Sequence, residues 1–197
     1  MAVNIDYCCF KFYNFFRIKG GNMKFNLCAK TVLMVDRYLE RITDAIDRLI
    51  ERRALNSFYV GLSGGSENSI TSVADYIINL SERKVKLINL KILIDMALEA
   101  CPILSAQILI ERYMDNEKSF DIAKRHNLSE RTYFRRLNEA LEHFSVEMSK
   151  LGFSEKRLFD YISSEKWIME VYNRLISAKS DDSVQIDENR LGKLVAG

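Results

Sequence analysis

Proline is almost absent from this chain of 197 residues, and that absence constrains the fold most: Pro102 is the only one. Apolar residues recur at helical spacing over residues 31–55, 70–101 and 103–176, with short polar breaks. An apolar period near 3.6 residues is typical of amphipathic helices, which proline interrupts. We therefore predict an all-α protein: a long helical hairpin or coiled-coil-type arm, then a helix-turn-helix, then C-terminal helices.

Residues 1–30 do not fit this pattern and are interpreted as an N-terminal extension. A signal peptide is not indicated, because an uninterrupted apolar region and a small-residue cleavage site are missing. The residues Lys-Gly-Gly-Asn-Met at 19–23 can be encoded by DNA that carries a bacterial ribosome-binding sequence before a start codon. We hypothesise that Met23, or even Met34, is the natural start; the alternative is an N-terminal helix that binds a membrane or a partner.

Residues 31–101 are predicted to form the helical arm, with a Gly/Ser-rich flexible linker at 61–69. The second arm helix has two apolar stripes. One consists of Ile77, Ile78, Val85, Ile88, Ile92 and Met96, and the other of Leu80, Leu87, Ile94 and Leu98. The first arm helix would cover one stripe, and the next domain or a second subunit the other. A homodimer through the arm and plain packing within the chain both remain open.

Residues 102–150 are predicted to form a helix-turn-helix domain centred on 119–141. Ser119 is expected to cap a short first helix, and Asn127 tolerates the left-handed conformation that a tight turn needs. Leu128 would pack the turn onto the core, and Ser129 would cap the second helix. In that helix the apolar face is predicted to consist of Tyr133, Leu137, Ala140, Leu141 and Phe144.

The helix-turn-helix concentrates the positive charge of the chain. Residues 124–136 hold five Lys or Arg against Glu130, whereas the whole chain carries a net charge of only +2. This concentration is typical of phosphate binding, although a solvated basic face on an ordinary helical hairpin is the plainer alternative. We predict that double-stranded DNA is contacted by Lys124, Arg125, Ser129, Glu130, Arg131, Thr132, Arg135 and Arg136.

The remaining sequence indicates no catalytic or cofactor chemistry. Cys8, Cys9, Cys28 and Cys101 have no metal-ligand or disulfide spacing, and no paired carboxylates or nucleophile beside a base can be identified. No apolar stretch is long enough to span a membrane. The cysteine pattern indicates reduced thiols and a cytoplasmic protein. Because catalytic and metal-binding groups are missing, we expect that the protein is not an enzyme and binds no cofactor or metal. Residues 151–178 are predicted to form C-terminal helices and residues 179–197 a disordered tail.

Residues 104–144 resemble the promoter-reading fourth region of bacterial sigma factors. The shared features are a helix ending in Glu-Arg-Tyr-Met, a polar turn, Ser-x-x-Ile-Ala, and then Leu-Ser-Glu-Arg-Thr before Arg-Arg-Leu-x-x-Ala-Leu. The longer layout of residues 35–145 resembles small phage and prophage transcription regulators of Gram-positive bacteria, of the RinA/ArpU type. These resemblances imply a transcriptional regulator that acts with RNA polymerase.

Three rival functions remain open from the sequence. A complete alternative sigma factor would need a separate domain that melts the promoter, and two arm helices with a linker are too little for one. A phage small-terminase subunit also combines a helix-turn-helix with an oligomerising coiled coil. A purely structural helical protein would bind no DNA.

Overall fold

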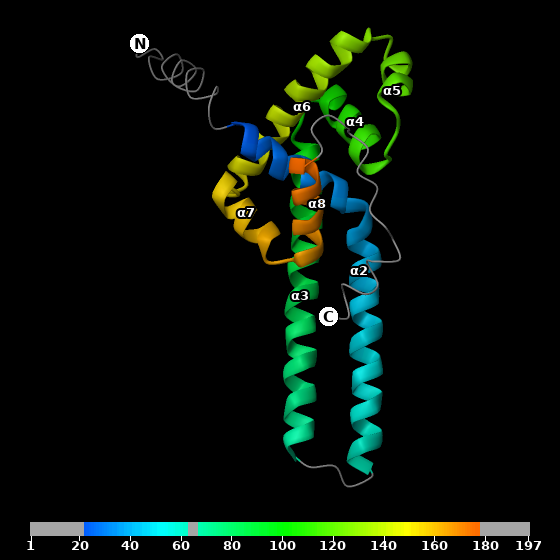
Figure 1. The fold of residues 1–197 in the computed structure, drawn as a ribbon, viewed down its shortest axis with the longest axis vertical. Helices are drawn as coiled ribbons and strands as arrows, with labels where there is room; N and C mark the ends of the chain where they lie inside the picture. Colours follow the sequence, from blue (N-terminus) through cyan, green and yellow to red (C-terminus); the bar gives the residue numbers. More distant parts are fainter. Residues whose placement is uncertain (1–21, 63–66, 178–197) are drawn as a thin grey trace, which may run out of the picture.

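The computed structural model describes residues 22–62 and 67–177, and these residues form helices joined by short turns, without a strand. The prediction of an all-α fold is confirmed. Figure 1 shows a long antiparallel hairpin whose upper end carries the remaining helices. In chain order the elements are α2 (Asn22–Leu62), α3 (Glu67–Glu99), α4 (Ile103–Leu109), the π-helical turn η1 (Ile110–Met114), α5 (Ser119–Arg125), α6 (Glu130–Lys150), α7 (Glu155–Ser163) and α8 (Lys166–Ser177).

The two arm helices are longer than the sequence predicted. Helix α2 begins at Asn22 rather than near residue 31, and it includes Cys28 and Ala29, which are fully buried. Residues 61–62 and 67–69 are helical, so the predicted linker at 61–69 is wrong at both edges. Once a helix is nucleated, each further residue adds a hydrogen bond at little cost, so the two helices can continue through residues that the apolar pattern does not include.

Several predictions concern residues that the structure does not describe. These residues are 1–21, 63–66 and 178–197. The predicted disordered tail and most of the N-terminal extension therefore lie outside the described residues, as do Cys8 and Cys9.

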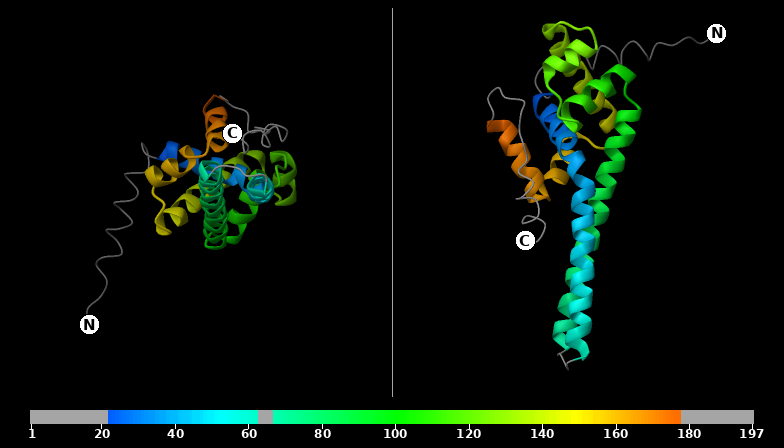
Figure 2. Two further views of the ribbon diagram at one scale, coloured as in Figure 1. Left: turned by 90° about the horizontal axis from the view of Figure 1, so that it is seen from below. Right: turned by 90° about the vertical axis from the view of Figure 1, so that its right-hand side faces the viewer.

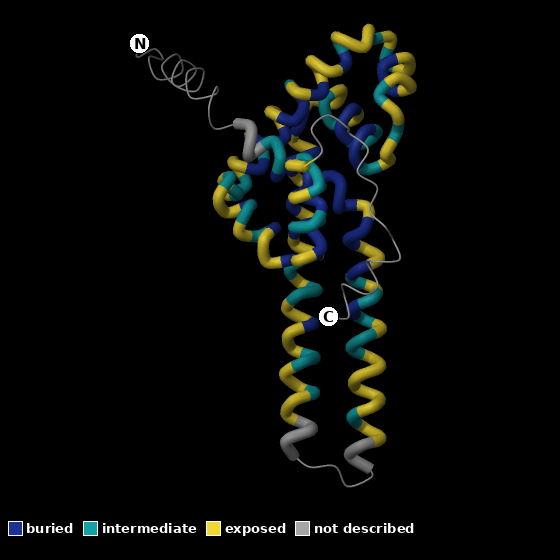
Figure 3. Tube along the Cα trace, viewed as in Figure 1, coloured by how far each residue is buried: buried dark blue, intermediate teal, exposed yellow. Residues whose placement is uncertain are grey.

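Helices α2 and α3 pack along one apolar seam, and ion pairs border it. One of the two apolar lines predicted on α3 is buried against α2, and it consists of Leu80, Leu87, Ile94 and Leu98. Lys84 on α3 pairs with Asp47 on α2 at 2.7 Å, and Lys91 lies 3.7 Å from the buried Asp36. Residues of the two helices are less buried toward the hairpin tip, where residues 51–56 are exposed (Figure 3).

The upper half of α2 lies inside the core that the other helices share. It contacts η1, α6, α7 and α8 as well as α3, and the views in Figure 2 show these helices wrapped around it. The largest fully buried side chains at this end include Tyr38, Tyr133, Phe144 and Trp167. The predicted division at residue 102 thus separates elements whose buried apolar residues belong to one cluster.

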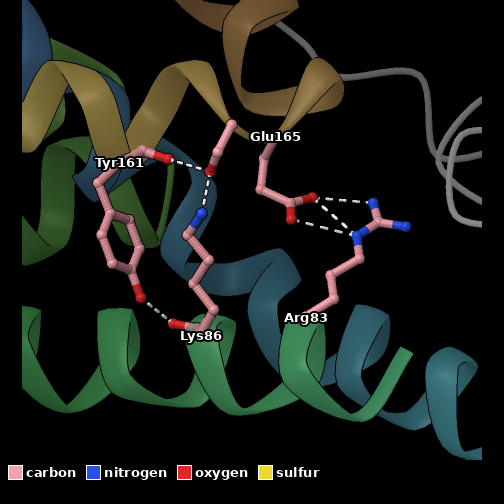
Figure 4. Close-up of polar contacts among 5 residues, drawn as sticks. Arg83, Lys86, Tyr161 and Glu165 are labelled. Carbon is pink, nitrogen blue, oxygen red and sulfur yellow. Dashed lines mark hydrogen bonds and ion pairs between the residues drawn. The ribbon is translucent and has the colours of Figure 1, made fainter. Parts of the chain in front are cut away.

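The corner between α7 and α8 is fixed to α3 by a polar cluster, called here the corner cluster (Figure 4). Arg83 pairs with the buried Glu165, with Nη2 and Nε 2.8 and 2.9 Å from Oε2. Tyr161 donates its hydroxyl to the backbone oxygen of Lys86, and the Lys86 ammonium donates to Ser164. These contacts therefore tie the corner between the C-terminal helices to the middle of α3.

In the described part of the chain, no helix is long and apolar enough to cross a membrane.

Candidate nucleic-acid interface

Helix α5 is the short first helix of the predicted helix-turn-helix. It begins at Ser119, one residue earlier than predicted, and Lys118 is the N-cap without a side-chain hydrogen bond. The predicted capping role of Ser119 is therefore wrong, because Ser119 itself lies within the helix. Ile122 and Ala123 face inward and are buried.

The turn between α5 and α6 has the predicted chemistry. Asn127 has a φ of +53°, the left-handed conformation that asparagine tolerates better than most residues. Leu128 packs against the core and donates its N–H to the oxygen of Ala123 at 2.8 Å. Ser129 caps α6, and its Oγ accepts the N–H of Thr132 at 3.3 Å. The turn therefore fixes the direction in which α6 starts.

Helix α6 packs through one face and exposes the opposite one. The five predicted apolar positions, Tyr133, Leu137, Ala140, Leu141 and Phe144, are all buried. Helix α4 provides much of the surface against which they pack. The core accommodates the bulky ring of Tyr133, which is 0% exposed. The amphipathic prediction for this helix is confirmed.

The residues predicted to contact DNA lie at the surface of this unit. All are exposed except Thr132, which is half-buried. By helical spacing, Arg131 and Arg135 lie on the outermost line of α6, half a turn away from its buried face. Arg136 and Thr132 lie on one flank of that line, whereas Glu130, seven residues before the buried Leu137, is exposed in the first turn on the side of the buried face. The start of α6 thus presents a guanidinium pair to solvent.

Two further exposed residues share this outer line and were missed from the sequence. Asn138 is seven residues beyond Arg131, and Glu142 is seven beyond Arg135, so each repeats its position two turns later. The spacing itself was the signal that could have found them. Asn138 offers amide donors and acceptors, whereas the carboxylate of Glu142 would repel phosphate. On α6, the exposed basic surface is therefore limited to the first two turns.

Arg125 is already engaged by acids that lie outside the basic stretch. Its guanidinium pairs with Glu111 at 2.9 Å and with Glu117 at 2.7 Å. His126 also bonds Glu111, with Nε2 2.9 Å from Oε2. Burial raises the pKa of Glu111, but the hydrogen bonds from His126 and Arg125 outweigh it and leave that pKa below its usual value. The contacts of Arg125 and His126 with Glu111 tie the end of α5 to η1. Together, Glu111 and Glu117 also offset the positive charge that Arg125 presents at the surface.

The two arginines in the second turn of α6 share one acid. Arg136 lies 3.2 Å from Glu139, and Arg135 lies 3.8 Å from it. These pairs are exposed, so water and salt screen them. Among the described residues, Lys124 and Arg131 have no carboxylate within ion-pair distance. They are the cations most available to a phosphate or a base.

A second polar site lies beside the corner cluster, away from α5 and the start of α6. A cavity of about 360 Å³ opens between α3 and the α7–α8 corner, lined in part by Arg83, Lys86 and Glu165. Arg83 bonds Glu165, and Lys86 bonds Ser164 and Tyr161, as Figure 4 shows, which indicates a structural role. Within residues 22–62 and 67–177, no group of three or more His, Cys, Asp or Glu residues is placed to hold a metal ion.

The described cysteines are two buried thiols. Cys28 and Cys101 are both free, and burial raises the pKa of each to about 11. Such thiols stay protonated near neutral pH. They are therefore unreactive, because the thiolate is the reactive form of cysteine. They act here as small core residues.

The fold and this surface define an all-helical protein that carries a helix-turn-helix on a long two-helix arm. Comparison with family models, with curated proteins and with solved structures finds no match to this chain.

Proposed function

We propose that the protein is a transcriptional regulator that binds double-stranded DNA in a sequence-specific way through α5 and α6. The observation that carries the proposal is the outward face at the start of α6, where Arg131 and Arg135 project from a capped and buried scaffold. In a helix-turn-helix, the N-terminal residues of the second helix contact base edges in the major groove. The protein then acts by binding rather than by catalysis, without a cofactor, in the cytoplasm.

The exposed residues divide into two roles under this proposal. Arg131 and Arg135 would contact base edges, because a guanidinium bonds guanine O6 and N7 together. Glu130 can accept a hydrogen bond from the cytosine amine. Thr132, next to Arg131 in the chain, would also lie near the bases. Lys124, Arg136 and the N-terminus of α6 at Ser129 are placed for phosphates, which set the register on the duplex.

The contacts of Arg125 change its part in the proposal. Because Glu111 and Glu117 hold its guanidinium, a phosphate would have to compete with two carboxylates. We therefore assign Arg125 chiefly to the orientation of α5 and keep any DNA contact secondary. Arg125→Ala would weaken DNA binding mainly by loosening the link between α5 and η1.

The regulatory part of the proposal rests on the resemblance to sigma region 4 and to phage regulators of the RinA/ArpU type. Those proteins act with RNA polymerase, and the same partner is proposed here. The described residues of α2 and α3 form one hairpin that is packed into the core at its upper end. Such an arm suits a factor that positions polymerase better than a complete sigma factor with its own DNA-melting domain.

One observation favours a second candidate, a DNA-packaging subunit of the small-terminase type. Such subunits combine a helix-turn-helix with an oligomerising helical part, and α3 carries exposed apolar residues on the side away from α2. A ring-sized assembly in solution would favour this candidate over a regulator.

Selection of bound duplexes from a random pool tests the proposed function. The full chain should enrich one sequence motif. Arg131→Ala should bind that motif about 1–3 kcal/mol less tightly and with relaxed base choice, whereas Lys124→Ala should weaken all duplexes alike. Arg52→Ala is the control, because Arg52 is exposed near the opposite end of the arm. Failure to enrich any motif, or identical losses for Arg131→Ala and Arg52→Ala, would contradict the proposal.

A further inference from the structure

A line of exposed apolar side chains runs along α3, called here the α3 stripe. It consists of Ile78, Val85, Ile88, Ile92 and Met96, each between 40% and 56% exposed. The residues that α3 buries against α2, such as Leu80 and Leu87, lie roughly half a turn away by helical spacing. Helix α2 therefore covers one side of α3, and within the described part of the chain nothing covers the stripe.

The α3 stripe has the dimensions of a helix-packing surface. Its ends, Ile78 and Met96, are 18 residues apart, which is five helical turns and about 27 Å. Small side chains at Ala74 and Ser81 continue the same line, so a partner helix can approach closely. The stripe itself contains no charged residue.

The charges beside the α3 stripe do not oppose a close partner. On one flank, Lys84 and Lys91 are paired with carboxylates of α2, and Asp95, seven residues beyond Ile88, lies near Lys91. On the other flank lie Glu82 and Asn89, by helical spacing. A partner surface of strong positive or negative charge, such as nucleic acid, would therefore find little to pair with here.

We propose that a second copy of this chain covers the α3 stripe, so that the protein is a dimer about a two-fold axis at α3. A two-fold contact uses the same patch on both copies, and a straight, uncharged apolar line satisfies that requirement by itself. The five side chains expose on the order of 400 Å² in one copy, so two copies with their polar borders approach the roughly 1,000 Å² that a specific interface needs. The proposal does not depend on DNA binding.

Sedimentation equilibrium of the full chain tests this proposal across a wide range of concentrations. The mass should be about twice the 22.9 kDa of one chain. Val85→Lys and Ile92→Lys should each raise the dimer dissociation constant at least tenfold, because a buried ammonium in the apolar seam would lack a partner. Val146→Lys and Ile176→Lys are matched controls, since these residues are 52% and 56% exposed on other helices, and both variants should remain dimers.

Three results would overturn the proposal. The first is a single-chain mass for the unaltered protein at every concentration. The second is a dimer or larger ring that Val85→Lys and Ile92→Lys leave intact. The third is a monomer that Ile92→Lys destabilises in urea, because that result would place a segment of the same chain on the stripe. A negative outcome here and a failure to enrich a DNA motif are separate measurements, so the two proposals can fail independently.

Discussion

Removing Arg83 should destabilise the protein far more than removing an exposed cation with an equally short ion pair. The Glu165 side chain is only 5% exposed, and Arg83 gives it two contacts below 3 Å. Arg83→Ala would leave a buried carboxylate without its cation, which costs about 3–5 kcal/mol at fully buried sites. Because the Arg83 side chain is 23% exposed, water can partly replace it, and we expect a loss of about 2–3 kcal/mol.

Urea unfolding followed by circular dichroism measures this loss. The matched control is Lys150→Ala, whose ammonium lies 2.7 Å from Glu147 but whose side chain is 65% exposed; it should cost less than about 0.5 kcal/mol. The double variant Arg83→Met with Glu165→Gln removes both charges and should recover most of the stability. Equal small losses for Arg83→Ala and Lys150→Ala, or a double variant less stable than Arg83→Ala, would refute the reasoning.

Substitutions at three further positions are predicted to have defined effects. Burial raises the pKa of Asp36 from 3.8 to about 6, against the opposing effect of Lys91. Protonation of Asp36 therefore favours the folded state, and the stability it contributes is complete below about pH 4 and is lost as the pH rises through 6. Asp36→Asn should match the unaltered protein in urea unfolding at pH 4 and exceed it at pH 7.5, by up to about 3 kcal/mol; a lower stability at pH 7.5 would show the sign to be wrong. At the turn, Asn127→Gly should change the thermal midpoint little, whereas Asn127→Val should cost at least about 1 kcal/mol because a β-branched residue resists positive φ; equal midpoints would argue against strain at this position. Ser129→Ala removes the α6 cap and should cost about 1 kcal/mol by the same assay, and no measurable loss would mean that the cap is dispensable.

The sequence was sufficient where one helix determines the answer. The apolar spacing of α6 predicted its buried face, and the left-handed Asn127 and the cap at Ser129 followed from local backbone chemistry. The two apolar lines of α3 were also predicted, because a helix that is apolar around much of its circumference has two faces that other helices can cover. These features depend on contacts within a few residues along the chain.

The sequence was insufficient where partners are distant. The basic count over residues 124–136 could not include Glu111 and Glu117, which the fold places against Arg125. Glu139 is a different case, because its pairs with Arg136 and Arg135 are three and four residues apart on one helix and follow from helical spacing. Local composition gave no sign that α3, η1, α6, α7 and α8 would all contact α2, or that Glu165 would meet Arg83 across 82 residues. The ends of the arm helices also escaped the pattern, because a helix can continue through residues that bury nothing.

The most direct test of the central claim is the salt dependence of DNA binding. With the selected duplex, the logarithm of the association constant should fall linearly with the logarithm of salt concentration, by about 0.9 for each phosphate contacted. Lys124→Ala should reduce that slope by about 1, and Arg52→Ala should leave it unchanged. Binding that is absent at low salt, or a slope that Lys124→Ala and Arg52→Ala alter equally, would contradict the assignment of α5 and α6 as the DNA-reading surface.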